Sequence, residues 1–159
     1  MSKAITPNAA GNLALELAAN TSQWAHLVRH DPEQRVFAPL EAGPYAGAWL
    51  ICWMPGHDTG FHDHDHSSGA VTVVSGQVRE ERIGEGFQVT GRTYAAGEVF
   101  AFGAGDIHRM LHAGDGPAVS IHVYSPKLQV MGAYAFGKTG MQRYELDSTV
   151  ELKPLEATG

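Results

Sequence analysis

The chain of 159 residues contains a single cysteine, Cys52, so an internal disulfide is excluded. A lone thiol fits a reducing compartment, where structural disulfides are rare. The first residues, MSKAITPNAAGN, show no basic stretch followed by an apolar one, and we expect no secretory signal. The interpretation is a cytoplasmic protein in which Cys52 serves as a small core residue.

Long hydrophobic runs and clusters of positive charge are also missing. The most apolar window, YAGAWLICWM (residues 45–54), is too short to cross a bilayer. The formal net charge is −6, and no segment gathers lysines and arginines, which argues against a phosphate-binding surface. We therefore expect neither a membrane nor a nucleic acid as a partner.

Glycine and proline, in contrast, are frequent and spread along the chain, with 19 and 8 residues. From Val36 onward, glycines separate short apolar or alternating runs, and no long helical pattern interrupts them. The runs are residues 48–53, 70–76, 77–83, 87–94, 98–102, 108–112 and 118–125. This pattern predicts one mostly β domain over residues 1–159, with a double-sheet jelly-roll β-barrel at about 35–146.

The N-terminal part has a different composition. Residues 8–30 are expected to form short helices, because LALELAA consists of helix formers and Thr21 is a candidate N-cap for TSQWAHLVRH. Asp31–Pro32 would end this helical segment. The last residues, 153–159, are expected to be frayed.

The densest group of metal-ligand residues is GHDTGFHDHDHSSGA, residues 56–70, which holds four histidines and three acids. Side chains alternate along a strand, so His62, His64 and His66 should share one face while Asp63 and Asp65 point away. Two histidines so spaced can hold a metal ion. A lone His-x-His is weak evidence, however, and a solvated polar loop is the alternative.

Two spaced motifs resemble those of the cupin superfamily. The first runs from Gly56 through His62 and His64 to Gly76. The second is GAGDIH, ending at His108, with Gly97 upstream and Gly103 in place of the usual proline. The resemblance implies a cupin-type jelly roll with His62, His64 and His108 as metal ligands.

Cupins normally have a glutamate ligand after the second histidine, with three or four residues between the two, where this chain has Ser68 and Gly69. We therefore expect three neutral imidazoles and no carboxylate on the metal. A divalent ion so held keeps its charge and open positions, which favours an anionic ligand such as a thiolate. His57 is not expected to bind the metal, and His66 is expected beside the ligands.

Two stretches, CWMPGHDTGFHDH (52–64) and AVSIHVYSP (118–126), resemble the cysteine dioxygenase family. The resemblance implies one mononuclear Fe(2+) ion and addition of both atoms of O2 to the sulfur of cysteine or another small thiol carboxylate, giving a sulfinate. It implies Ser120, His122 and Tyr124 as a relay beside the substrate, and a cis peptide bond at Ser125–Pro126. Strand alternation independently places 120, 122 and 124 on one face; mutual hydrogen bonding and packing in the core is the alternative reading.

The chain departs from this family at two places. Gly69 stands where animal members carry a cysteine that crosslinks to the tyrosine, so Tyr124 is expected to be an unmodified phenol. The family's arginine for the substrate carboxylate has no gap-free match. Arg35 is the candidate and Arg29 the substitute, although surface exposure is the commoner fate of an arginine.

Two other functions stay open at this point. Three histidines with an open position also describe a zinc hydrolase or lyase, and a non-catalytic cupin could sense or store a ligand. The Ser-His-Tyr strand favours thiol dioxygenation, because a water-activating zinc site needs a general base near the metal. The expected partners are a small thiol and O2, and the expected assembly is a monomer or small homo-oligomer.

Overall fold

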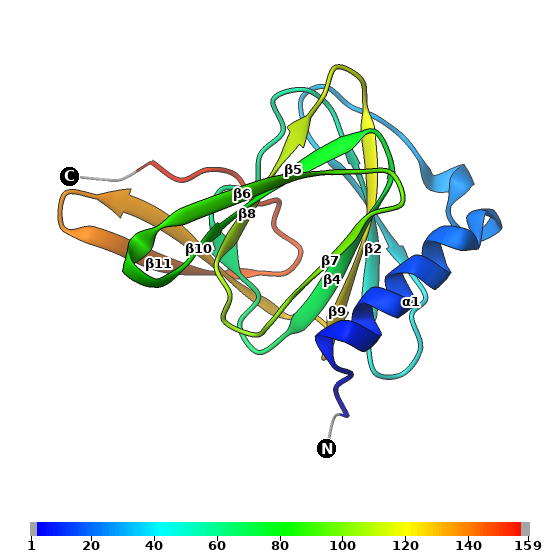
Figure 1. Cartoon of the computed structure of the whole chain (residues 1–159), viewed down its shortest axis with the longest axis horizontal. Coiled ribbons are helices and arrows are strands. Elements are labelled where there is room, and N and C mark those ends of the chain that lie inside the picture. Colours follow the sequence, from blue (N-terminus) through cyan, green and yellow to red (C-terminus); the bar gives the residue numbers. More distant parts are fainter. Residues whose placement is uncertain (1–2, 157–159) are drawn as a thin grey trace.

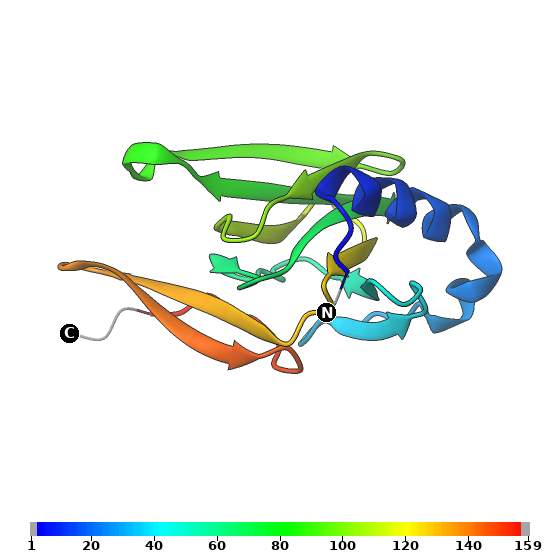
Figure 2. The same ribbon diagram turned by 90° about the horizontal axis from the view of Figure 1, so that it is seen from below.

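The protein folds into two antiparallel sheets that face each other, as Figures 1 and 2 show. The structure is a computed structural model that describes residues 3–156. Its strands are β1 (Val36–Leu40), β2 (Gly47–Trp53), β3 (His62–Asp63), β4 (Ser68–Ser75), β5 (Gln77–Ile83), β6 (Val89–Ala95), β7 (Val99–Phe102), β8 (His108–Ala113), β9 (Ala118–Ser125), β10 (Val130–Gly137) and β11 (Gly140–Asp147).

The strand order is that of a jelly roll. One sheet has the order β1-β2-β9-β4-β7, and the other has the order β11-β10-β3-β8-β5-β6. Two hairpins, β5–β6 and β10–β11, extend to the same side of the molecule in Figure 2, opposite α1 (Pro7–Ala19). The predicted mostly β, double-sheet jelly-roll fold with short N-terminal helices is confirmed, and the described residues form two sheets without a closed barrel.

Alternation along β2 and β9 divides the core into two clusters. Leu50, Cys52 and Ile121 point to the outer face of the five-stranded sheet and pack with Ala10 and Ala14 of α1. The intervening residues point between the two sheets, where they join residues such as Val71, Val73 and Phe100. Helix α1 therefore covers the outer face of the five-stranded sheet (Figure 1), and the polar residues of this sheet lie on its inner face.

Helix α1 begins at Pro7, after the N-cap Thr6, whose side chain accepts a hydrogen bond from the Ala9 N–H at 3.1 Å. The prediction that Thr21 caps a further α-helix is wrong. Residues 21–27 form only the 3-10 turns η1 (Thr21–Gln23) and η2 (Ala25–Leu27). The Trp24 indole N–H donates to the Leu17 carbonyl at 3.0 Å, which folds this segment back against the end of α1.

The chain packs against the rest of the protein directly after β11. The residues predicted to be frayed begin at Lys153, and 153–156 are exposed and form no helix or strand. Leu152 is buried against Met131 and Ala133, and Pro154 lies against Gly60. Of the predicted frayed residues, 157–159 lie outside the described part of the chain. Among residues 3–156, no helix has the length and apolar character needed to cross a membrane.

Candidate metal centre and its cavity

The three predicted metal ligands converge between the sheets. His62 on β3 is paired in register with His108 on β8, and His64 follows β3 directly. One ring nitrogen of each lies within 4.8 Å of those of the other two. All three side chains are buried, with exposed fractions of 1 to 3%.

Hydrogen bonds at the far side of two rings orient them toward the centre of this cluster. His62 Nδ1 lies 2.9 Å from the Gly60 carbonyl oxygen, and His108 Nδ1 lies 2.7 Å from Glu80 Oε2. A ring nitrogen that donates a proton in this way leaves Nε2 as the lone-pair nitrogen that a metal requires.

Two ring nitrogens of the cluster lack a hydrogen-bond partner, which fits a metal site. His108 Nε2 and His64 Nδ1 are buried and have no hydrogen-bond partner, a costly state for a polar atom. Burial lowers the pKa of His62 and His64 well below the ordinary value. Both rings are therefore neutral at physiological pH, the form in which histidine binds a metal.

Glu80 on β5 is a site residue that the sequence motifs did not reveal. Its Oε1 accepts from Arg82 Nε at 2.9 Å while Oε2 holds His108. Burial opposes ionisation of Glu80, but the hydrogen bonds from His108 and Arg82 prevail and lower its pKa. The available signal was its place in QVREERI, where alternation puts Glu80 on the same inward face as Val78.

The other two histidines of the motif lie away from this cluster. The expectation that His66 shares a face with His62 and His64 is wrong. Strand β3 ends at Asp63, the chain turns at Asp65 with φ of 55°, and the His66 side chain is 92% exposed. His57 is buried and satisfied, since Nδ1 accepts from the Met54 N–H at 3.0 Å and Nε2 lies 3.2 Å from the Pro32 carbonyl oxygen.

The predicted relay is a hydrogen-bonded chain on the inner face of β9. Trp53 Nε1 donates to Ser120 Oγ at 2.8 Å, Ser120 Oγ lies 2.7 Å from His122 Nε2, and His122 Nδ1 lies 3.3 Å from the Tyr124 hydroxyl. An indole nitrogen can only donate. Ser120 therefore accepts from Trp53. Because Ser120 is fully buried and its hydroxyl has no other partner among the described residues, its proton is satisfied only by donation to His122 Nε2.

The same direction of hydrogen-bond donation extends from His122 to Tyr124. Burial lowers the pKa of His122 to about 3, so the ring is neutral and carries its single proton on Nδ1, facing Tyr124. Burial raises the pKa of Tyr124 above its ordinary value, and the phenol stays protonated. Because the Tyr124 oxygen accepts from His122, its own O–H is free to donate elsewhere.

Arg35 reaches the same cavity, and Arg29 does not. Arg35 is 4% exposed, and its guanidinium lies 5.2 Å from the Trp53 ring centroid. Arg35 Nη1 donates to the Asp58 carbonyl at 3.1 Å, Nη2 donates to the Leu152 carbonyl, and Nε is buried without a partner. Arg29 is exposed and lies outside the lining of the cavity.

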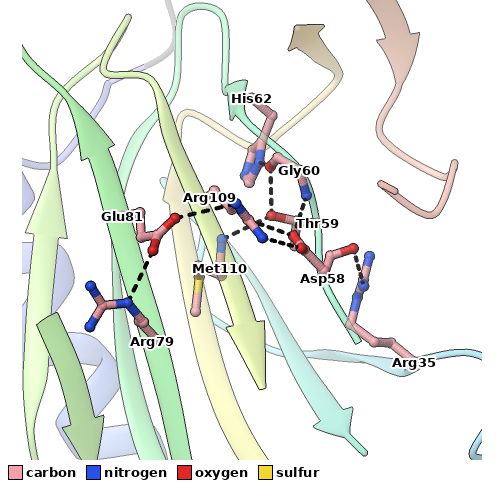
Figure 3. A network of polar contacts seen from close by, with 9 residues as sticks. All are labelled: Arg35, Asp58, Thr59, Gly60, His62, Arg79, Glu81, Arg109 and Met110. Atoms are coloured by element: carbon pink, nitrogen blue, oxygen red, sulfur yellow. Dashed lines mark hydrogen bonds and ion pairs between the residues drawn. The ribbon is translucent and has the colours of Figure 1, made fainter. Parts of the chain in front are cut away.

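A network on the loop before β3 fixes both Arg35 and His62 (Figure 3). The Asp58 carboxylate accepts from Arg109 at 3.0 and 2.6 Å and from the Gly60 N–H at 2.8 Å. The carbonyl oxygens of Asp58 and Gly60 in turn contact Arg35 and His62. One anchored loop thus orients both a cationic side chain and a metal ligand.

These groups surround a cavity of about 360 Å³ between the sheets. The three histidines, His122, Tyr124 and Arg35 line it together with apolar side chains such as Phe102 and Met110. Residues 148–152, after β11, form part of the wall, which the sequence did not predict. Such a mainly apolar cavity with few polar groups is typical of a small-molecule site.

The structure also bears on the predicted absence of a crosslink. Gly69 is paired in register with Tyr124, and a side chain there would collide with the Val123 carbonyl oxygen. Cys52 points to the opposite face of its sheet, under α1, where burial raises the pKa of its thiol. The Ser125–Pro126 peptide bond is cis, as expected.

Similarity to known proteins extends over most of the chain. The family model for cysteine dioxygenase type I matches residues 3–137. Cysteine dioxygenase type 1 from Danio rerio is 24% identical over 74% of this chain and 64% of its own length. The chain thus spans somewhat less than two thirds of this curated relative.

Solved structures support the fold. A protein from Thermus thermophilus superposes with a TM-score of 0.57 at 23% identity, covering 65% of this chain and 93% of its own. A conserved Klebsiella pneumoniae protein with a double-stranded β-helix domain superposes with a TM-score of 0.54 at 21% identity, covering 77% and 94%. At such identities the likeness extends to the fold alone.

Proposed function

The chain belongs to the cysteine dioxygenase type I family, and from this membership we propose that it is an iron(II)-dependent thiol dioxygenase. The reaction is RSH + O2 → RSO2H, in which both oxygen atoms are added to the sulfur of cysteine or another small thiol carboxylate. The observation that carries this proposal is the meeting of a three-histidine cluster, the Ser120–His122–Tyr124 chain and Arg35 in one cavity.

His62, His64 and His108 would hold the metal in this proposal. A bound iron(II) ion would supply open positions for a thiolate and O2 and the redox chemistry that joins them. The protein contributes the neutral ligands, with Gly60 and Glu80 fixing the direction of two of them. The absence of a carboxylate ligand leaves the ion its positive charge, which attracts the thiolate.

Arg35 is the proposed partner of the substrate carboxylate. Its guanidinium has more N–H groups than the two backbone carbonyls use, and Nε is buried without a partner. Stacking near Trp53 holds the guanidinium in place. A carboxylate at Arg35 would direct the thiol of a small substrate toward the histidines across the cavity.

Tyr124 is the proposed hydrogen-bond donor to the reacting group. The chain from Trp53 through Ser120 and His122 leaves its O–H free, and burial keeps it protonated. A fixed donor in a buried site stabilises charge that develops on sulfur or oxygen. His122, with a pKa of about 3, is a weak base, which disfavours a zinc site that abstracts a proton from water.

The test is to prepare metal-free protein, load it with iron(II) or zinc(II), and follow O2 uptake with cysteine, other thiol carboxylates and cysteamine. Uptake that needs iron and a thiol, with one sulfinate formed per O2 consumed, is expected. Hydrolytic activity with zinc and no O2 uptake with iron would contradict the proposal. A cytoplasmic location and a monomer or small homo-oligomer remain predictions; the lone Cys52 supports the former.

A further inference from the structure

The segment after β11 is a fixed wall of the cavity. It begins with a turn in which the Val150 N–H donates to the Asp147 carbonyl at 3.1 Å. Leu152 then packs in a buried cluster with Met131. Residues 148–152 line the cavity.

This wall carries a negative charge beside Arg35. Among the described residues that line the cavity, Arg35 and Glu151 are the only Arg, Lys, Asp or Glu side chains. Glu151 Oε2 accepts from the Arg35 backbone N–H at 3.0 Å and lies 3.8 Å from Arg35 Nη2. The Arg35 side chain is 2% exposed and that of Glu151 is 21% exposed.

A ligand therefore meets a positive and a negative charge at one end of the cavity. A thiol whose only other charged group is a carboxylate must share Arg35 with Glu151 and approach a like charge. A thiol that also carries an ammonium group presents a donor to Glu151 and a carboxylate to Arg35, so both protein charges gain a partner.

We propose that Glu151 is a specificity-determining residue, which favours thiols with an ammonium group over thiols whose only other charge is a carboxylate. This inference rests on the proposed function, and it adds a residue that selects among small thiols. The discrimination has two parts. Arg35 attracts the carboxylate of the thiol, and Glu151 repels a thiol whose only other charge is negative.

The test compares the Glu151→Gln variant with the wild type and with Glu156→Gln, which makes the same charge change on the exposed end of the same segment. Glutamine keeps an acceptor for the Arg35 N–H, and thermal unfolding checks the fold of each variant. Each iron-loaded protein is assayed for O2 uptake and, without O2, for thiol binding. The probes are cysteine, 3-mercaptopropionate and cysteamine.

Glu151→Gln is expected to lower the kcat/KM ratio of cysteine to 3-mercaptopropionate by roughly 10-fold or more, the usual effect of losing a hydrogen bond to a charged group. Cysteamine should also bind more weakly, and Glu156→Gln should leave the ratio unchanged. An unchanged ratio in Glu151→Gln would mean that Glu151 only neutralises Arg35, and the inference would be wrong.

Failure of the proposed function gives a different result. In that case the wild type takes up no O2 with any thiol, and anaerobic binding still tests Glu151. A lower relative affinity of Glu151→Gln for cysteine would support the inference. Equal relative affinities would overturn it, and no thiol binding at all would overturn both.

Discussion

Two facts together assign the direction of the hydrogen bonds in the chain that ends at Tyr124. The Trp53 indole nitrogen can only donate, and the fully buried Ser120 hydroxyl has only His122 to donate to among the described residues. The serine hydroxyl and the neutral imidazole then each have one remaining way to donate, toward Tyr124. A tyrosine that accepts from His122 presents its own proton to the cavity. The chain thus fixes which atom donates without requiring His122 to change its charge.

Tyr124→Phe should keep iron and thiol binding but lose turnover, because the ring remains and only the donor is removed. The expected loss in kcat is roughly 10²- to 10⁴-fold, typical of a positioned proton donor. Steady-state O2 uptake and anaerobic thiol binding measure the two effects separately. Intact-mass analysis of the wild type after turnover should show no loss of two hydrogens, since Gly69 has no thiol beside the ring. A fully active Phe variant or a Cys52–Tyr124 adduct would contradict this role.

Glu80→Gln should weaken iron binding by about 10- to 100-fold, the usual effect of changing a residue that orients a metal ligand. The glutamine keeps the size of the side chain but removes the charge that faces His108 and Arg82. Competition with a chelator measures the iron affinity. Glu85→Gln, at an exposed turn, is the matched control, and equal affinities of the two variants would contradict the role of Glu80.

His62, His64 and the relay could be predicted because each group lies within a short stretch of chain, whereas His108 was assigned to the ligands through the resemblance to the second cupin motif. Spacing places His62 and His64 together, and alternation places 120, 122 and 124 on one face. The prediction that His66 shares a face with His62 and His64 is wrong because it also relies on alternation, and strand β3 ends at Asp63. Glu80 lies 28 residues from His108, and no local pattern connects them.

At the scale of elements, the loop between β2 and β3 determines how well the cavity is preorganised. Arg109 on β8 holds the Asp58 carboxylate with two hydrogen bonds, 51 residues away in sequence. The backbone carbonyls of Asp58 and Gly60 are fixed as a result, and they contact Arg35 and His62 (Figure 3). The loop therefore couples the position of the proposed carboxylate site to that of the metal site.

Arg109→Ala should weaken iron binding and raise the KM of thiol carboxylates together, each on the order of 10-fold. Both effects are expected because loss of Arg109 frees the loop between β2 and β3, whose carbonyl oxygens contact Arg35 and His62. Chelator competition and O2 uptake measure them, and Arg92→Ala, which removes an exposed ion pair with Glu98, is the control. Asp58→Asn combined with Arg109→Ala should be less than additive; full additivity would show that the two residues act independently.

The contacts of the segment after β11 could not be predicted from the sequence. KPLEATG has no periodicity and ends in three small residues, which is typical of a frayed terminus. The contact between Leu152 and Arg35 joins residues 117 apart. Only the folded chain brings them together, so neither Glu151 nor the wall of the cavity could be inferred from local composition.

In the whole molecule, one face of the five-stranded sheet packs in the core and the other faces the cavity. The outer face packs under α1 and contributes stability, while the inner face contributes Trp53, His122 and Tyr124 to the cavity, with Ser120 fully buried between Trp53 and His122. A third, smaller cluster around Met131 and Leu152 attaches the end of the chain to the six-stranded sheet. The jelly roll was predictable because short apolar or alternating runs separated by glycines recur from Val36 onward, and because two motifs resemble those of cupins.

Leu152→Ala should lower the free energy of unfolding by about 2 kcal/mol or more, because a buried leucine leaves a cavity when truncated. Leu155→Ala, at a position that is 40% exposed, should change it by less than about 0.5 kcal/mol. Denaturant unfolding measures both. Equal effects would show that the C-terminal segment does not pack as described.

The central claim is that this protein adds both atoms of O2 to a thiol at the three-histidine site. The most direct measurement is mass spectrometry of the product formed by iron-loaded protein from cysteine and isotopically labelled O2. A sulfinate in which both oxygen atoms are labelled is expected. His64→Ala should form none, and His66→Ala should form near-normal amounts, because the His66 side chain is exposed. An unlabelled sulfinate, a disulfide as the only product, or full activity in His64→Ala would contradict the central claim.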